Sequence, residues 1–390
     1  HNLPADCVNI ILGLLGDVLP KGHKMPASFY ECKNMLGVLK MPYVKIDVCT
    51  NNCMLYYKED EKKEKCDICG ESRYEVVEGE SSEIKQSLIP RKVMRYLPIT
   101  ARLQRMYLSA ELAKHMRWHK EGERSYPAGV IGHPSDAKAW KDFDREFPEF
   151  AKDARIVRLV IATDGFNAFK FGGSQYSCWP VFVSPLNLPP ALCMSEENIF
   201  LTMVIPGPQH PGKNINVFMR PLVHELLQLW AGVDTYDSVK KESFRMKVAY
   251  LFSVHDYPAY GMFTGWCTHG GLACAVCMDD VDTTWLPNGH KYGWFDCHRC
   301  FLRPDHPFRM QENAFIKRTK VLEPPPRRLI GEEVDARINH LKSQSFEGYG
   351  TTHNWTHIPV LWELPYFKKL LIRHNIDVMH NEKNVAEAIW

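Results

Sequence analysis

The fold is decided by two stretches of sequence, Val157-Arg-Leu-Val-Ile-Ala-Thr-Asp164-Gly-Phe and Val248-Ala-Tyr-Leu-Phe-Ser-Val-His-Asp256-Tyr-Pro-Ala. In each, a run of β-forming residues ends on an aspartate, with Gly or Pro within the next two residues. Such a strand leaves its carboxylate at the carboxyl edge of a sheet. Two such acids from neighbouring strands suit hard divalent cations such as Mg²⁺. Each Asp can also simply begin a turn, but the repeated pattern favours an acidic metal site in an α/β domain.

Length and composition set the broad class of the protein. With 390 residues, the chain is long enough for two or three domains. Its 45% hydrophobic and 24% charged residues are ordinary for globular proteins. The net charge of +2 means that any nucleic-acid surface must be a local patch. No run approaches 18 apolar residues, so we expect no membrane span.

The pattern along the chain predicts four regions. Residues 1–42 are expected to be an N-terminal helical segment, and 43–90 a cysteine-rich module followed by a charged linker. Residues 91–150 form a helical, basic connecting region. From 151 to 390 the chain is strand-rich, with an irregular insertion at about 262–370. The sequence begins at His1 rather than Met, and its last residues resemble a helix cut in mid-course, so we expect a fragment truncated at the C-terminus.

Hydrophobic periodicity predicts individual elements within these regions. Helices are expected within 5–40, from about 100 to 120, at 219–232, 238–246 and 371–390. Strands are expected at 156–164, 179–184, 198–205 and 247–256. The charged stretch from Glu75 to Lys85 is predicted to be a linker.

The first cysteine cluster is close to a zinc-ribbon pattern. Cys49 and Cys53 precede, by a twelve-residue spacer, Cys66 and Cys69. Two such short turns can present four thiolates tetrahedrally to one Zn²⁺, and Gly70 suits the tight turn after the second pair. Paired spacing of this kind is typical of metal binding in a reducing compartment, rather than of disulfides. We expect a closed, structural zinc site.

A second pair, Cys274 and Cys277, supplies only half of a zinc site. The residues that would complete it are left open by the sequence. The alternatives are Cys297 with Cys300, His290 with His298, or the distant His374 with His380.

The terminal segment concentrates two histidines and two acids, in Arg373-His374-Asn-Ile-Asp377-Val-Met-His380-Asn-Glu382. On a helix, Asp377 and His380 are neighbours, whereas Glu382 points about 200° away from His380. The segment is either a solvated polar face or the source of one more acid for the metal site.

Basic residues of the connecting region could bind DNA phosphates or form a solvated helix face. They are Arg95, Arg102, Arg105 and Arg117.

Several strings resemble the transposases of plant CACTA (En/Spm) DNA transposons, and the resemblance extends over nearly the whole chain. They are Asp164-Gly-Phe-Asn-Ala-Phe, Pro206-Gly-Pro-Gln-His-Pro-Gly, Arg220-Pro-Leu-Val-His-Glu-Leu, Gly232-Val-Asp-Thr-Tyr-Asp, His255-Asp-Tyr-Pro-Ala-Tyr-Gly and Asp377-Val-Met-His-Asn-Glu-Lys-Asn-Val, together with the cysteine module.

This resemblance implies an RNase H-like core of the DDE type, with the first acid in the first strand and the second in the fourth. Asp164 and Asp256 match these positions. The third acid would sit on a helix after the insertion. Glu382 is the expected residue, and the alternatives are Asp377 or an acid beyond Trp390. The related recombinase lineage implies a zinc site joining Cys274 and Cys277 to His374 and His380.

The function implied by the resemblance is metal-dependent cleavage and strand transfer at transposon ends, with Mg²⁺ or Mn²⁺ at the acids and structural Zn²⁺ at the cysteines. The implied partners are DNA terminal repeats and either further copies of the chain or a second element-encoded protein, in the nucleus. The alternative is an inactive or domesticated relative that binds DNA or protein without cutting. Cys300 and Asn381 depart from the residues expected in relatives, which bears on activity rather than on the fold.

Overall fold

The computed structural model describes residues 4–20, 22–23, 25–32, 43–78, 84–123, 127, 129–167, 176–294, 297–343 and 347–390. The chain divides into two compact units, His1–Tyr43 and Val44–Trp390. The first contains α1 (Ala5–Val18), a helix with no buried residue. This helix covers part of the predicted range 5–40, of which residues 33–40 lie outside the described residues.

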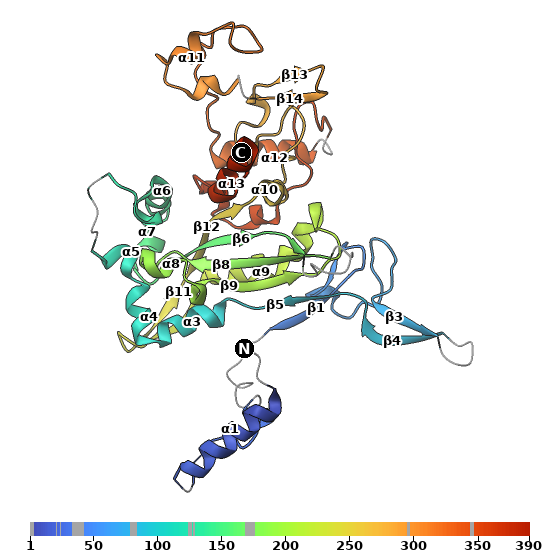
Figure 1. The fold of residues 1–390 in the computed structure, drawn as a ribbon, viewed down its shortest axis with the longest axis vertical. Helices are drawn as coiled ribbons and strands as arrows, with labels where there is room; N and C mark the ends of the chain where they lie inside the picture. The colour runs from blue at the N-terminus through green and yellow to red at the C-terminus, as the bar shows by residue number, and fades with distance from the viewer. Residues whose placement is uncertain are drawn as a thin grey trace. The chain divides into compact units, whose positions relative to one another are not determined.

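A mixed sheet is the centre of the second unit (Figure 1). Its strands lie in the order β15-β12-β6-β8-β9-β5-β1-β2, and β7 pairs with β8. The strands β6, β12 and β15 are parallel neighbours, and the other pairs are antiparallel. Their bounds are β1 Val44–Val48, β2 Leu55–Tyr56, β5 Val93–Tyr96, β6 Val157–Thr163, β7 Phe166–Asn167, β8 Ser177–Pro185, β9 Phe200–Ile205, β12 Val248–His255 and β15 His374–Ile376.

The two stretches quoted first form β6 and β12, side by side in the sheet. Almost every residue of β6 is buried, because layers of the protein cover both sheet faces there. The sequence of a strand that is covered on both faces is a continuous apolar run, without alternation of polar and apolar residues. The predicted strands at 179–184 and 198–205 correspond to β8 and β9.

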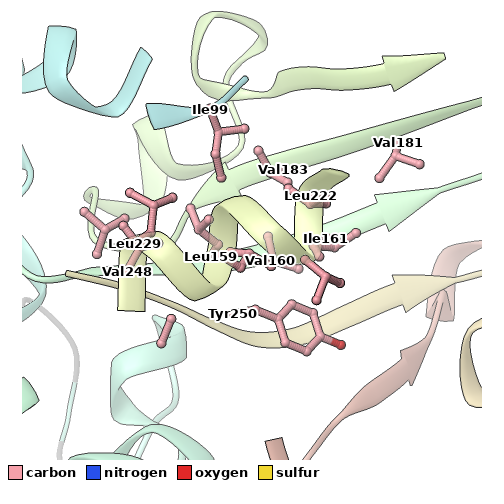
Figure 2. Packing of buried hydrophobic residues seen from close by; sticks show 14 of the residues in the cluster. Ile99, Leu159, Val160, Ile161, Val181, Val183, Leu222, Leu229, Val248 and Tyr250 are labelled. Carbon is pink, nitrogen blue, oxygen red and sulfur yellow. The ribbon is translucent and has the colours of Figure 1, made fainter. Parts of the chain in front are cut away.

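Helix α9 (Ile215–Ala231) packs on the sheet and forms much of the core. Figure 2 shows Leu222 and Leu229 of this helix among side chains such as Ile161 and Val248. Both leucines are fully buried, and each such burial stabilises the fold by about 1.5–3 kcal/mol. The helix ends at Gly232, whose φ of +99° is one that residues with a Cβ rarely adopt.

The connecting region and the insertion also contain helices. The chain between β5 and β6 is helical over much of 100–151, as predicted for residues 100–120. The bounds of the remaining helices are α3 Thr100–Leu108, α4 Ala110–His115, α5 Trp118–Glu121, α6 Lys138–Glu146, α7 Pro148–Ala151, α8 Pro190–Cys193, α10 Tyr257–Thr264, α11 Pro307–Met310, α12 Gly331–Ser343 and α13 Val378–Ile389.

Three predicted elements differ from the structure. The range 238–246 is not helical: it contains β11 (Glu242–Met246), which pairs with β10 (Val233–Asp237) in a hairpin. The side chains of β11 alternate between exposed and buried, which is the period of a strand. Within the predicted linker 75–85, residues 75–78 belong to β3 (Tyr74–Glu78) and residues 84–85 to β4 (Ile84–Pro90), which pair with each other, while residues 79–83 lie outside the described residues. The terminal helix begins only at Val378, after the short strand β15.

The N-terminal strands belong to the same sheet as the later core, because β5 pairs with β9 and β1 pairs with β5. Within the predicted insertion, Trp266, Trp355 and residues of α12 form a second, smaller core. A further hairpin in the insertion pairs β13 (Thr284–Leu286) with β14 (Lys291–Gly293). No helix in the described parts of the chain is long and apolar enough to cross a membrane.

Candidate active site and metal centre

Three aspartates lie at one edge of the central sheet. In the parallel register, Thr163 of β6 is opposite His255 of β12, and His255 is opposite Ile376 of β15. The next residue along each strand is an aspartate: Asp164, Asp256 and Asp377. Because parallel strands end at the same sheet edge, the three carboxylates emerge from adjacent strand ends. We refer to these three residues as the acidic edge.

Local hydrogen bonding fixes two of the aspartates as helix N-caps. The Asp256 carboxylate accepts from the backbone N–H of Ala259 at 2.9 Å, at the start of α10. The Asp377 carboxylate accepts from the backbone N–H of His380 at 3.2 Å, at the start of α13. Asp is among the best N-cap residues for this reason. The same residues therefore end a strand, begin a helix and retain oxygen atoms for a further ligand.

Asp164 is exposed at the end of β6, and the next residue packs closely against an aromatic ring. A Cβ built on Gly165 would lie 2.6 Å from the Trp179 ring. The chain can pass the ring at this point only because Gly165 has no side chain. The Trp179 ring is held in turn by a hydrogen bond from its Nε1 to Ser177 Oγ, at 2.9 Å.

The charges of the acidic edge act on one another. Burial raises the pKa of Asp256, and the nearby carboxylates of Asp164 and Asp377 raise it further. The hydrogen bond from Ala259 and the proximity of His380 oppose this rise. A cation bound between the carboxylates would relieve their repulsion and favour the charged form of Asp256.

The structure separates the two candidates for the third acid. Asp377 is half-buried and close enough to Asp256 to affect its pKa, whereas Glu382 is exposed on α13. The sequence argument assumed a helix through both residues, but the helix begins only after Asp377. The geometry favours Asp377 at the edge. The role of each acid remains a prediction.

The carboxylate oxygens of the acidic edge are more widely spaced than those of a preformed metal cage. Among the described residues, one group of three or more potential ligands has all its donor atoms within 4.8 Å of one another, and that group is the first cysteine cluster. A cation held by all three aspartates would therefore require their side chains to rotate inward. Carboxylate oxygens are nevertheless the donor type that Mg²⁺ and Mn²⁺ prefer.

Two buried histidines lie directly behind the acidic edge. The His255 ring packs on Phe263, with centroids 4.2 Å apart, and neither ring nitrogen has a hydrogen-bond partner. Burial lowers the pKa of His255 to about 3, so the ring is neutral. His374 lies in β15, and its Nδ1 is 2.7 Å from Ser253 Oγ. Burial, together with His255 and Arg373, also keeps the pKa of His374 well below its usual value.

The first cysteine cluster fits a zinc ion. The ligand atoms of Cys49, Cys53, Cys66 and Cys69 all lie within 4.8 Å of one another. Tetrahedral Zn–S bonds of about 2.3 Å would place the sulfurs about 3.8 Å apart, and the Sγ atoms of Cys49 and Cys69 are 3.4 Å apart. A four-thiolate site of this kind is structural, because no coordination position remains open.

Backbone turns bring the four sulfurs of this cluster together. Gly70 has a φ of +74° and donates its N–H to the Cys66 carbonyl, at 2.8 Å. Asn52, with a φ of +61°, donates likewise to the Cys49 carbonyl. Backbone N–H donation from Glu71 lowers the pKa of Cys69 to about 6. The thiolate form that binds metal is therefore favoured at Cys69.

The second cysteine pair lies near residues from more than one of the ligand sets that the sequence left open. The backbone N–H of Cys277 lies 3.3 Å from the Cys274 sulfur. Both residues line a cavity of about 380 Å³ together with His298 and Cys300. His374 lines a neighbouring cavity together with Ala275 and Val276, and its Nδ1 is 2.7 Å from Ser253 Oγ. Cys297, another of the alternatives, has no described side chain. The ligand set of this pair remains a prediction.

The four arginines predicted to contact DNA differ in exposure. Arg95 in β5 and Arg105 in α3 are exposed. Arg102 donates to the Leu201 carbonyl at 2.7 Å. Arg117 is buried in an ion pair with Asp237. Arg117 could reach a phosphate only by breaking that pair, so Arg95 and Arg105 are the more accessible of the four.

Sequence reasoning ranked Asp377 below Glu382 and gave no role to His255 and Ser253, which lie in β12 just before Asp256. The strand before Asp377, His374-Asn-Ile376, is too short to show an alternation of polar and apolar residues. Asp377 does carry one usable signal: it precedes a helical stretch, as an N-cap residue does. For His255, its position at the end of the apolar run from Val248 indicated that its side chain would be buried.

Comparison with models of protein families identifies the family of the chain. The sequence model of the family described as "Transposase family tnp2" matches residues 128–341, which is more than half of the chain. The matched segment includes Asp164, Asp256 and the pair Cys274/Cys277, and it ends before Asp377. A comparison with curated proteins finds no match.

Proposed function

Since the chain belongs to the transposase family tnp2, we propose that it is a DNA transposase of the DDE type, of the kind encoded by CACTA (En/Spm) elements. In this proposal the acidic edge is the active site, and its RNase H-like core cleaves DNA at transposon ends and transfers the strands. The observation that carries the proposal is the register Thr163–His255–Ile376, which is followed in all three strands by an aspartate.

The strand sequence supports the RNase H-like assignment. In chain order from β6, and leaving out the two-residue strand β7 that pairs with β8, β8 is the second strand of the central sheet, β9 the third and β12 the fourth. Asp164 follows the first strand and Asp256 the fourth, which are the positions that the resemblance implies. The hairpin of β10 and β11 pairs only with itself and does not alter this count.

Asp164, Asp256 and Asp377 would hold the divalent cations of such a site. When bound, Mg²⁺ or Mn²⁺ stabilises the attacking and leaving oxygens of an in-line displacement at phosphorus. The protein's contribution is to hold the three carboxylates on adjacent strand ends and helix N-caps, from which their side chains would rotate inward to reach a cation. Burial raises the pKa of Asp256, and the neighbouring carboxylates raise it further, so a bound cation would favour its charged form.

DNA is the partner that the family suggests. A DNA substrate would place the protein in the nucleus, and the resemblance to CACTA elements would place it in a plant cell. Joining two transposon ends requires more than one DNA-binding subunit. We therefore expect a homo-oligomer or a complex with a second element-encoded protein. Zn²⁺ at the first cysteine cluster would stabilise the strands β1 and β2 that flank it.

Nicking of a plasmid that carries the terminal repeats of the encoding element tests the proposal. Wild-type protein should nick this plasmid only when Mg²⁺ or Mn²⁺ is present. D164N and D256N should lose nicking while keeping DNA binding and the unfolding temperature, because Asp164 is exposed and Asn can replace Asp256 as the N-cap of α10. Retained nicking in either variant would refute the assignment. DNA binding without nicking in the wild type would instead identify a non-cutting relative.

A further inference from the structure

A small cavity lies between the insertion and the end of the central sheet. It has a volume of about 40 Å³ and is lined by residues that include Tyr260, Thr264, Arg328, Arg373 and His374. Tyr260 is in α10, the helix that Asp256 caps, and its backbone N–H donates to the Asp256 carbonyl. His374 precedes Asp377 by three residues. The cavity therefore adjoins the elements that carry the acidic edge.

Two arginines supply the charge of this cavity. Arg328 is exposed, and Arg373 is half-buried. The two guanidinium groups are close enough to interact electrostatically. No Asp or Glu is among the described residues that line the cavity. Two like charges at close range on a protein surface repel each other unless an anion lies between them.

Two acids close to Arg328 in the sequence have partners outside the cavity, although Glu332 also acts electrostatically on Arg373. Glu333 accepts two hydrogen bonds from Arg327, at 2.6 and 3.0 Å. Glu332 is 2.7 Å from Lys369. Within the described residues, Arg373 donates only to a backbone carbonyl, that of Leu370, at 3.2 Å. Neither cavity arginine has an ion pair with a carboxylate in the described parts of the chain.

We propose that the cavity between Arg328 and Arg373 binds a phosphate group. Guanidinium groups present a planar set of donors that matches phosphate oxygens. A cavity of about 40 Å³ offers room for roughly three water-sized probes, at about 10–15 Å³ each. This space accepts a tetrahedral anion, but it is too small for a nucleobase with its sugar. The walls formed by Trp266 and Trp355 exclude solvent from one side.

The phosphate could belong to a DNA strand at the acidic edge or to free inorganic phosphate. Only the DNA source rests on the proposed function, since an anion site would exist whether or not the protein cuts DNA. Two measurements separate these sources, and both use one matched pair of variants. R328A removes the exposed cavity arginine. R327A removes the neighbouring charge, which is paired with Glu333 outside the cavity.

The first measurement is thermal unfolding of the full chain with inorganic phosphate, at constant ionic strength. Phosphate should raise the unfolding temperature of the wild type and of R327A, because a ligand that binds only the folded state stabilises it. R328A should lose most of this shift, and R328K should recover part of it. An equal shift in R328A and the wild type, or no shift in the wild type, would overturn the proposal.

The second measurement is the salt dependence of binding to a DNA duplex. If the site holds a DNA phosphate, R328A should reduce the slope of log K against log salt by about 0.9, and R327A should leave the slope unchanged. An unchanged slope with a thermal shift that depends on Arg328 supports the site and identifies free phosphate as its ligand. D256N should keep the phosphate-induced shift even if it loses nicking, so failure of the phosphate site and failure of the proposed function give different results.

Discussion

At the scale of single residues, burial gives neighbouring side chains of β12 opposite properties. His255 and Asp256 are adjacent in sequence, yet burial lowers the pKa of the first and raises that of the second. The reason is common to both: a low-dielectric surrounding disfavours the charged form. His255 is therefore a neutral ring, and Asp256 is a carboxylate that gains from a nearby cation.

The buried ring of His255 should make stability depend on pH. Its folded pKa of about 3 lies below the unfolded value of about 6.5, so the unfolded chain takes up the proton first as pH falls. Stability should therefore decrease below about pH 6.5, by about 2 kcal/mol between pH 7 and pH 5 from this residue alone. In urea unfolding, the free energy of unfolding of H255F should fall by about 2 kcal/mol less than that of the wild type between pH 7 and pH 5. H115Q, which removes a histidine from helix α4, should retain the wild-type pH dependence. Equal pH dependence in H255F and the wild type would contradict the prediction.

Comparison of Asp377 with Glu382 tests the identity of the third acid. D377N should reduce divalent-cation-dependent nicking by at least about 100-fold, because lesser changes around a metal already cost 10–100-fold. E382Q removes an exposed charge from the same helix and should change nicking less than about twofold, as a surface substitution does. The reverse result would assign the role to Glu382. D377S separates loss of the N-cap from loss of a metal ligand, because Ser also caps helices but is a poor metal ligand. This variant should keep the wild-type unfolding temperature and lose nicking.

At the scale of elements, short strands and turns position the metal ligands. The first cysteine cluster joins the end of β1 to the start of β2, which are the outermost strands on one side of the central sheet. A strand at a sheet edge has unpaired backbone groups and needs support. Zinc at the cysteines would supply that support by tying the β1–β2 turn to the turn at Cys66–Gly70.

Removal of zinc should therefore expose the outer strands before it unfolds the rest. The C66S variant should contain about one equivalent of zinc less per chain than the wild type does. C178S is the matched control: Cys178 is in β8, away from the cluster, and should keep the zinc content unchanged. Limited proteolysis of C66S, or of chelated wild type, should cut first within residues 43–75. Wild-type zinc content in C66S, or unchanged proteolysis, would contradict this prediction.

At the scale of the whole molecule, buried polar contacts join the N-terminal part of the second unit to the later core. Glu225 of α9 accepts hydrogen bonds from the backbone N–H groups of Ile99 and Thr100, at 3.1 and 2.8 Å, and from the hydroxyls of Tyr96 and Thr100. One carboxylate thus fixes the start of α3 against α9. The buried pair of Arg117 and Asp237 makes a similar link between α4–α5 and the β10–β11 hairpin.

Loss of the Glu225 carboxylate should destabilise the chain strongly. E225A would leave buried donors without partners, and it should cost about 2–5 kcal/mol of the free energy of unfolding. E363A is the matched control, since Glu363 forms an exposed pair with Arg220 and should cost less than about 1 kcal/mol. Urea unfolding of the two variants measures both values. A similar, small loss in both would show that the Glu225 contacts do not hold the connecting region in place.

The sequence by itself determined the strands that end on Asp164 and Asp256 and the set of four cysteines. Each of these features is local: an apolar run stopped by Asp and Gly or Pro, or a short cysteine spacing, depends on neighbouring residues alone. The segment 238–246 was predicted wrongly as helix, because pairing with β10 outweighs its local helix propensity.

Only the tertiary structure decided which distant residues meet. The alignment of Asp377 with Asp256 depends on a three-residue strand that is stable only because it pairs with β12. The burial of Arg117 depends on Asp237, 120 residues later in the chain. The joining of β5 to β9 depends on backbone hydrogen bonds, which leave no signature in side-chain pattern. Local composition sets where strands and turns form, whereas register, burial and charge pairing arise from packing between segments far apart in sequence.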